Sequence, residues 1–237
     1  MILQEGSDRY EFDTPFKGIK NLKEQKPDVH PFTLDEVWIF LNHVRHDYKS
    51  YYTTRFFTGM RSSEIDGLKW ECVDFDRREI KVRSAIVDGI EGPTKTYGSN
   101  REIAMSQLVY DALREQKRYT FGKSDYVFCN SQGKPLEHRN VNRRVWTPTL
   151  KLLGLKHRRA YQTRHTAATL WLAAGENPEW IARQMGHSST EMLFRVYSRY
   201  VPDMTRQDGS AIDSLLLASK KLAQEQVKQR INDNKDE

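Results

Sequence analysis

The spacing of apolar residues changes twice along this chain of 237 residues, and the change limits the folds that the chain can adopt. Before residue 73 and after residue 105 the apolar residues recur at helical intervals, whereas between these points they alternate with polar ones. In the segment 79–83, Ile80 and Val82 share one face of a predicted strand, and the segment 101–105 can pair with it. The sequence therefore predicts a mainly helical α+β fold with a small antiparallel sheet.

Capping residues mark several helix boundaries. Thr33 and Glu36 form a capping box in front of an apolar face, and Asn177 followed by proline is typical of a helix start. This last helix is expected to end at Gly186, which leaves His187 at the head of the next turn. Further helices are predicted over residues 51–57, 106–118, 141–153 (with a kink at Pro148) and 163–174.

The composition divides the chain into three parts. Residues 1–32 are polar and interrupted by prolines, which predicts a linker or an extended arm. Residues 33–205 contain the helix and strand patterns of a folded body. Residues 206–237 contain an apolar helical stripe followed by a charged tail. This stripe packs either on its own domain or on a neighbouring copy of the chain, and the sequence leaves both open.

Basic residues outnumber acidic ones by 38 to 32, and the formal net charge of +6 favours an anionic partner. The distribution of the charges is more informative than their sum, because the segment 138–164 contains no acidic residue. A run of basic residues that ends at Arg164 favours a phosphate-binding surface. Five of its arginines are therefore candidate contacts to nucleic acid: Arg139, Arg143, Arg144, Arg158 and Arg159.

The cysteines and the apolar stretches of the chain indicate in which cell compartment it works. Cys72 and Cys129 are the only cysteines, and their spacing fits neither a disulfide framework nor a thiolate zinc cluster. Residues 1–13 lack an apolar signal core, and the aliphatic run 215–218 is too short to cross a bilayer. We expect a cytoplasmic protein without membrane contact.

Five residues spread along the chain offer the chemistry of phosphodiester attack. Arg61 and Arg164 each present a planar, permanently charged guanidinium that can hold phosphate oxygens. Tyr197 can serve as a nucleophile that keeps the phosphate covalently attached. Lys95, in a Gly-rich connection between the predicted strands, and His187, after the expected helix end at Gly186, complete this set.

Five motifs follow one another along the chain: an arginine box (58–68), a lysine-bearing turn (94–103), a second arginine box (161–169), the segment 185–189 around His187, and Tyr197, ten residues after His187. Their order resembles that in the catalytic domain of tyrosine recombinases of the phage integrase family, which has a DNA breaking-rejoining enzyme fold. Each motif alone is weak, but their order makes the resemblance specific over residues 33–200.

The resemblance implies a role for each residue. Arg61 and Arg164 would clamp the non-bridging oxygens of the scissile phosphate. Lys95 would protonate the departing 5′ oxygen. Tyr197 would form a 3′-phosphotyrosine, so that rejoining needs no ATP, no metal and no other cofactor. His187 would hydrogen-bond the phosphate or assist the tyrosine.

One position departs from the family pattern. The second box usually has a histidine three residues before its arginine, where this chain has Tyr161. A phenol, with its pKa of about 10, can donate a hydrogen bond to phosphate but does not take up a proton near neutral pH. We therefore expect Tyr161 to stabilise the phosphate and His187 to carry any base function. Glu64 is expected to orient the site, and His165 to be buried in a structural role.

With the resemblance, the sequence predicts a site-specific DNA recombinase, the integrase of a phage or another mobile element. It would act on double-stranded DNA as a tetramer, and accessory DNA-bending proteins are compatible with this function. Three alternatives stay open: a non-catalytic DNA-binding module derived from a recombinase, a type IB topoisomerase-like enzyme, and a metal-dependent hydrolase that uses His157, His165 and His187. Because family members usually carry a core-binding domain before the linker, residues 1–32 are interpreted as a remnant of that connection, and weak DNA affinity is expected.

Overall fold

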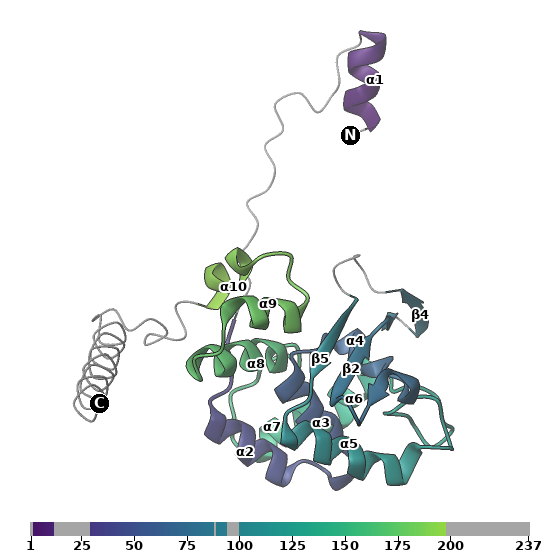
Figure 1. The fold of residues 1–237 in the computed structure, drawn as a ribbon, viewed down its shortest axis with the longest axis vertical. Helices are drawn as coiled ribbons and strands as arrows, with labels where there is room; N and C mark the ends of the chain where they lie inside the picture. The colour runs from purple at the N-terminus through teal and green to yellow at the C-terminus, as the bar shows by residue number, and fades with distance from the viewer. Residues whose placement is uncertain (1, 12–28, 88, 94–99, 198–237) are drawn as a thin grey trace, which may run out of the picture.

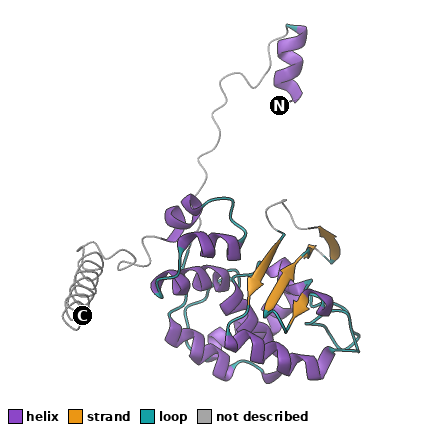
Figure 2. Ribbon diagram, viewed as in Figure 1, coloured by secondary structure: helices purple, strands orange, loops and turns teal. Residues whose placement is uncertain are grey.

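A computed structural model of the chain describes residues 2–11, 29–87, 89–93 and 100–197. The fold combines helices with two small antiparallel sheets, and the hairpin that contains β4 lies at the edge of the molecule (Figures 1 and 2). The helices before the sheets are α1 (Ile2–Tyr10), α2 (Leu34–His43), α3 (His46–Thr58), α4 (Ser62–Asp66) and the 3₁₀ turn η1 (Trp70–Cys72). The strands are β1 (Val73–Asp74), β2 (Glu79–Val82), β3 (Ser84–Val87), β4 (Ile90–Pro93) and β5 (Arg101–Ala104). The later helices are α5 (Gln107–Thr120), α6 (His138–Val141), the π-helical segment η3 (Asn142–Trp146), α7 (Thr147–Leu152), α8 (Gln162–Ala173), α9 (Pro178–Met185) and α10 (Thr190–Tyr197).

The predicted pairing of strands is confirmed. β2 and β5 are antiparallel neighbours with Ile80 opposite Ile103, and both side chains are fully buried. β1 pairs with the other edge of β2, which gives the order β1-β2-β5. A separate hairpin of β3 and β4 occupies part of the connection that the sequence assigned to a loop. The mainly helical α+β class is therefore correct, with more strand than the alternation predicted.

The core consists of two clusters. The larger one is built around aromatic rings, with Phe40 4.8 Å and Tyr52 5.4 Å from the ring of Trp146. Burial of each such side chain contributes on the order of 2–3 kcal/mol. The smaller cluster joins α8, α9 and α10 and includes Ile181 and Tyr197. The candidate nucleophile is thus part of a separate small core, formed by the three helices drawn in green in Figure 1.

The helix predicted over residues 141–153 begins earlier, at His138, and contains the π-helical segment η3 instead of a kink. Pro148 lies in the first turn of α7, directly after η3. A proline ring clashes with the carbonyl four residues before it and lacks an N–H to donate. The wider turn of the π segment accommodates this mismatch, which apolar spacing alone does not reveal.

Two stretches of the predicted amino-terminal arm, residues 2–11 and 29–32, are among the described residues. Residues 2–10 form α1 and contain no proline, the first of which is Pro15. Packing of the folded body starts before residue 33, since Val29 and Phe32 are buried. The backbone N–H of Phe32 donates to Oγ1 of Thr166 at 2.9 Å, which fastens this segment to α8.

Lys95 and the predicted carboxyl-terminal stripe and tail, 206–237, lie outside the described residues. Among the helices that are described, none has the length and apolar character needed to cross a membrane.

Candidate active site

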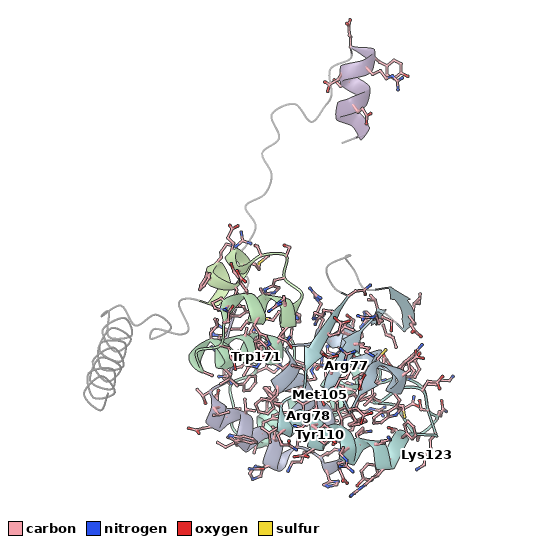
Figure 3. All side chains as sticks on the ribbon, viewed as in Figure 1. Arg77, Arg78, Met105, Tyr110, Lys123 and Trp171 are labelled. Carbon is pink, nitrogen blue, oxygen red and sulfur yellow. The ribbon has the colours of Figure 1, made fainter. Side chains whose placement is uncertain are left out.

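The first arginine box is held in place by a buried carboxylate. Arg61 caps α4, and its backbone N–H and Nη1 donate to Glu64 at 2.8 and 2.7 Å. Before it, Gly59 ends α3 in the left-handed region at φ +62°, where a Cβ would lie 3.1 Å from the ring of Trp171, which Figure 3 labels. Glycine is therefore required at this turn for both its backbone angle and its size.

Arg101, at the start of β5, completes this cluster. Its Nη1 and Nη2 donate to the two carboxylate oxygens of Glu64 at 3.0 and 2.9 Å, and Nε donates to the carbonyl of Gln184 at 2.6 Å. Burial raises the pKa of Glu64, but the hydrogen bonds and charges of Arg101 and Arg61 outweigh it and lower that pKa to about 2. The ion pair of Glu64 and Arg101 thus connects α4 to β5, and the hydrogen bond from Arg101 to Gln184 connects β5 to α9.

Sequence reasoning did not assign a site role to Arg101. Its only signal was a place next to the lysine-bearing turn, at the start of a predicted strand. The residue is 6% exposed, and Gly186 lies against it: a Cβ at Gly186 would lie 3.1 Å from Cδ of Arg101. A buried arginine needs a buried partner, and only the tertiary structure reveals that Glu64 supplies it.

Arg164 lies in the first turn of α8 and is 2% exposed. Its Nη1 donates to the carbonyl of Gly59, and its Nη2 donates to the carbonyl of Met185 at 2.6 Å and lies 3.2 Å from Nε2 of His187. Burial lowers its pKa to about 10, so the guanidinium is charged at neutral pH. Within the described part of the chain no carboxylate forms an ion pair with it. This buried positive charge is therefore suited to an anionic ligand.

His187 follows Gly186, the left-handed residue that ends α9 at φ +66°. Its backbone N–H donates to the carbonyl of Ala182 at 2.9 Å. Burial, then the nearby charges of Arg164 and Arg61, lower the pKa of the imidazole to about 4, so it is neutral at neutral pH. Its Nδ1 is buried and has no hydrogen-bond partner among the described residues. The ring therefore keeps an unused hydrogen-bonding group beside the arginine.

Tyr197, on α10, is 2% exposed, and burial raises its pKa. Its hydroxyl lies 2.8 Å from Nδ1 of His165, the residue directly after Arg164 on α8. The expectation that His165 is buried is confirmed, at 9% exposure. Its hydrogen bond to the candidate nucleophile was not foreseen, because the two residues are far apart in the sequence.

Tyr161 precedes α8 and is 43% exposed. Its ring lies 5.1 Å from that of His165 in an edge-on arrangement. The phenol is thus at the surface of the site, in contact with the histidine that holds Tyr197. An open pocket of about 540 Å³ lies beside the site and is lined in part by Arg101 and His187.

The five candidate DNA-binding arginines of the segment 138–164 differ in their exposure to solvent. The guanidinium of Arg158 lies 4.2 Å above the ring of Phe32 and pairs with Glu36 at 2.9 Å. It joins the amino-terminal segment to the folded body, a role that the charge pattern did not predict. The other four candidates have exposed side chains: Arg139, Arg143, Arg144 and Arg159.

In the described ranges, no three His, Cys, Asp or Glu side chains form a group that could hold a metal ion. The three histidines considered for a hydrolase are in different settings. His165 contacts Tyr197, His187 contacts Arg164, and His157 is exposed in the loop before α8.

Comparison with known sequences gives a clear match. The sequence profile of the phage integrase family matches residues 32–202. The protein IntQ of Escherichia coli strain K12, which is described as defective, is 31% identical over 230 residues, and the prophage integrase IntR of the same strain is 28% identical over 227. Both alignments cover 85% of this chain, but 58% of IntQ and 55% of IntR. The chain thus spans little more than half the length of these relatives.

Solved structures show the same fold. The Tn1549 transposon integrase in complex with a circular intermediate DNA has a TM-score of 0.71 at 19% identity, over 91% of this chain and 75% of that one. A lambda integrase tetramer bound to a Holliday junction has a TM-score of 0.56 at 14% identity, over 79% of this chain and 55% of that one. At such identities the likeness concerns the fold alone.

Proposed function

Because this chain belongs to the phage integrase family, we propose that it is the catalytic part of a site-specific DNA recombinase of a phage or another mobile element. One observation carries this proposal. The charged guanidinium of Arg164, which has no carboxylate partner among the described residues, is adjacent in sequence to the histidine that holds the hydroxyl of Tyr197. This supports the proposal, because the candidate phosphate clamp is near enough for its charge to act on the candidate nucleophile Tyr197.

In the proposed reaction, Arg164 and Arg61 bind the non-bridging oxygens of the scissile phosphate and stabilise the charge of the transition state. The hydroxyl oxygen of Tyr197 attacks phosphorus, and the 5′ oxygen of the next nucleotide leaves. The resulting 3′-phosphotyrosine keeps the energy of the broken bond, so the 5′ hydroxyl of another strand can reverse the step. We assign the proton for the leaving oxygen to Lys95.

Two neutral side chains complete the proposed clamp. His187 is beside Arg164, and its unused Nδ1 can hydrogen-bond a phosphate oxygen in the tautomer that carries the proton there. Tyr161 is exposed enough to donate its phenolic proton to the same group. The Tyr161→Phe variant tests the second contact: we expect cleavage about tenfold slower, and unchanged cleavage would refute the contact.

We further propose that residues 33–205 form the catalytic domain, that its partner is double-stranded DNA, and that it acts in the cytoplasm. The exposed arginines Arg139, Arg143, Arg144 and Arg159 support DNA binding, because cationic side chains at the surface can contact phosphates. A tetramer on DNA, with or without accessory DNA-bending proteins, is the proposed working assembly. The lambda integrase tetramer bound to a Holliday junction supports this by analogy of fold.

A covalent-trapping experiment tests the central proposal. A pool of nicked duplexes with random sequence around the nick is incubated with the chain, and adducts are recovered by denaturing electrophoresis and sequenced. The nick releases a short fragment after cleavage, so the phosphotyrosine cannot be resealed. We expect an adduct that is lost in Tyr197→Phe and retained in the control Tyr119→Phe, which changes an exposed tyrosine of α5. An adduct that survives Tyr197→Phe would refute the assignment, and its absence in the unaltered chain would favour a non-catalytic DNA-binding module.

A further inference from the structure

The proton on the hydroxyl of Tyr197 needs an acceptor when this oxygen attacks phosphorus. The hydroxyl is buried, at 2% exposure for the residue, so bulk water does not reach it readily. Nδ1 of His165 lies 2.8 Å away, within the range expected for a base and the proton that it removes. The group that receives this proton is therefore to be sought among the side chains around the hydroxyl.

The other side chains nearby are poorer acceptors. Arg164 stays protonated even with its lowered pKa of about 10. Tyr161 contacts the ring of His165 and is a phenol, which gives up a proton instead of gaining one. Nε2 of His187 is directed at Arg164, at 3.2 Å, and not at Tyr197.

We propose that His165 is the general base for Tyr197, an inference that rests on the proposed function. In this step the O–H bond of Tyr197 breaks and its proton moves to Nδ1 of His165. The oxygen forms a bond to phosphorus, and the bond from phosphorus to the 5′ oxygen breaks. His165 returns the proton to the tyrosine oxygen when the strand is rejoined. This assigns to His165 the proton transfer that the sequence suggested for His187.

The charges around His165 connect this step to substrate binding. Arg164 and Tyr161 face it from the start of α8, Tyr197 from α10, and His187 from the turn after α9. In the free protein, burial and the charge of Arg164 lower the pKa of His165 to about 4, which makes it a weak base. A phosphate bound to Arg164 offsets that charge and strengthens the base. The tyrosine is therefore activated when DNA is in the site.

The tautomer of His165 tests the proposal without DNA. A base at Nδ1 must be unprotonated there, with the proton of the neutral ring on Nε2. We expect ¹⁵N spectra of the histidine-labelled full chain to show an unprotonated, hydrogen-bonded Nδ1 for His165, whose signal shifts in Tyr197→Phe. The control Tyr119→Phe should leave the signal in place. A proton on Nδ1 would overturn the proposal, because that nitrogen would then donate to the tyrosine oxygen.

Kinetics provide the second test. In His165→Asn the side-chain oxygen takes about the position of Nδ1, so it can still accept the hydrogen bond of Tyr197 but cannot take up its proton. We expect single-turnover adduct formation on the trapped duplex to be about 100-fold slower near pH 7 and to recover as the pH rises and hydroxide replaces the base. The matched control is His43→Asn, which alters an exposed histidine of α2 and should keep the full rate.

The outcomes are distinguishable. If the unaltered chain forms an adduct and His165→Asn forms it within threefold of the same rate, the base assignment is wrong while the proposed function stands. A slow variant whose rate does not rise with pH would indicate a structural role and also overturn the assignment. If the unaltered chain forms no adduct, the proposed function itself fails, whatever the tautomer of His165.

Discussion

Replacement of Glu64 by glutamine removes the charge that holds Arg101 and Arg61. The carboxylate is 2% exposed and accepts hydrogen bonds from both arginines. Its pKa is lowered from 4.5 to about 2, which corresponds to about 3 kcal/mol of native-state stability at about 1.4 kcal/mol for each factor of ten in acidity. Loss of one partner of a buried pair has a similar cost, about 3–5 kcal/mol. We expect Glu64→Gln to lower the free energy of unfolding by about 3 kcal/mol at pH 7.

The pH dependence follows from the sign of this pKa change. The unfolded chain binds the proton at a pKa near 4.5, whereas the folded protein binds it only near pH 2. The stabilisation is therefore complete above pH 4.5 and is lost as the pH falls towards 2. At pH 3 the difference between the unaltered chain and Glu64→Gln should shrink to about 1 kcal/mol.

Urea unfolding followed by tryptophan fluorescence measures both quantities, since Trp146 is buried in the main core. Glu115→Gln is a suitable control, because Glu115 pairs with Arg118 on the surface, with 40% and 77% of the two side chains exposed. This control should change the free energy of unfolding by less than about 1 kcal/mol. A Glu64→Gln variant within 1 kcal/mol of the unaltered chain at pH 7, or a gap of equal size at pH 3, would refute the reasoning.

Three further variants test local features by the same unfolding assay. Gly186→Ala should lower the free energy of unfolding by about 1–2 kcal/mol, because alanine is strained at φ +66° and its Cβ would press on the buried Arg101. The control Gly92→Ala, which has open space at the Cβ, should not lower it. Asn177→Ala removes the cap whose side chain accepts from two backbone N–H groups of α9, and a loss of about 1 kcal/mol is expected; no loss would show that the cap is dispensable. Leu113→Ala should cost about 2–5 kcal/mol, since that side chain is fully buried, and a smaller loss would mean that the core refills the cavity.

Local patterns in the sequence predicted much of the fold. The pairing of the segments 79–83 and 101–105, the capping box at Thr33, and the helix from Asn177 to Gly186 are all present. These features depend on neighbours a few residues apart, so their physical causes are visible in a short window of sequence. The hairpin β3–β4 and the π-helical segment were missed, because the first has no strict alternation and the second has the apolar spacing of an ordinary helix.

For the candidate site, too, the sequence predicted some features and missed others. The chemical types and order of Arg61, Arg164, His187 and Tyr197 were enough to identify a family, because recognition depends on motifs and not on distances. The run of basic residues predicted a larger DNA-binding surface than the structure offers, because Arg158 forms an ion pair with Glu36. Whether a charged residue is exposed or paired depends on chain segments distant in sequence, which a run of letters cannot show.

The sequence by itself determined that this chain is a mainly helical domain with a small sheet and that it belongs to the phage integrase family. The tertiary structure alone decided how those residues are connected: Arg101 reaches Glu64 across 37 positions, and His165 reaches Tyr197 across 32. Hydrogen bonds and ion pairs act over a few ångströms in space, whatever the separation along the chain. Packing of α8, α9 and α10 therefore sets which imidazole is next to Tyr197, and with it the base that we propose.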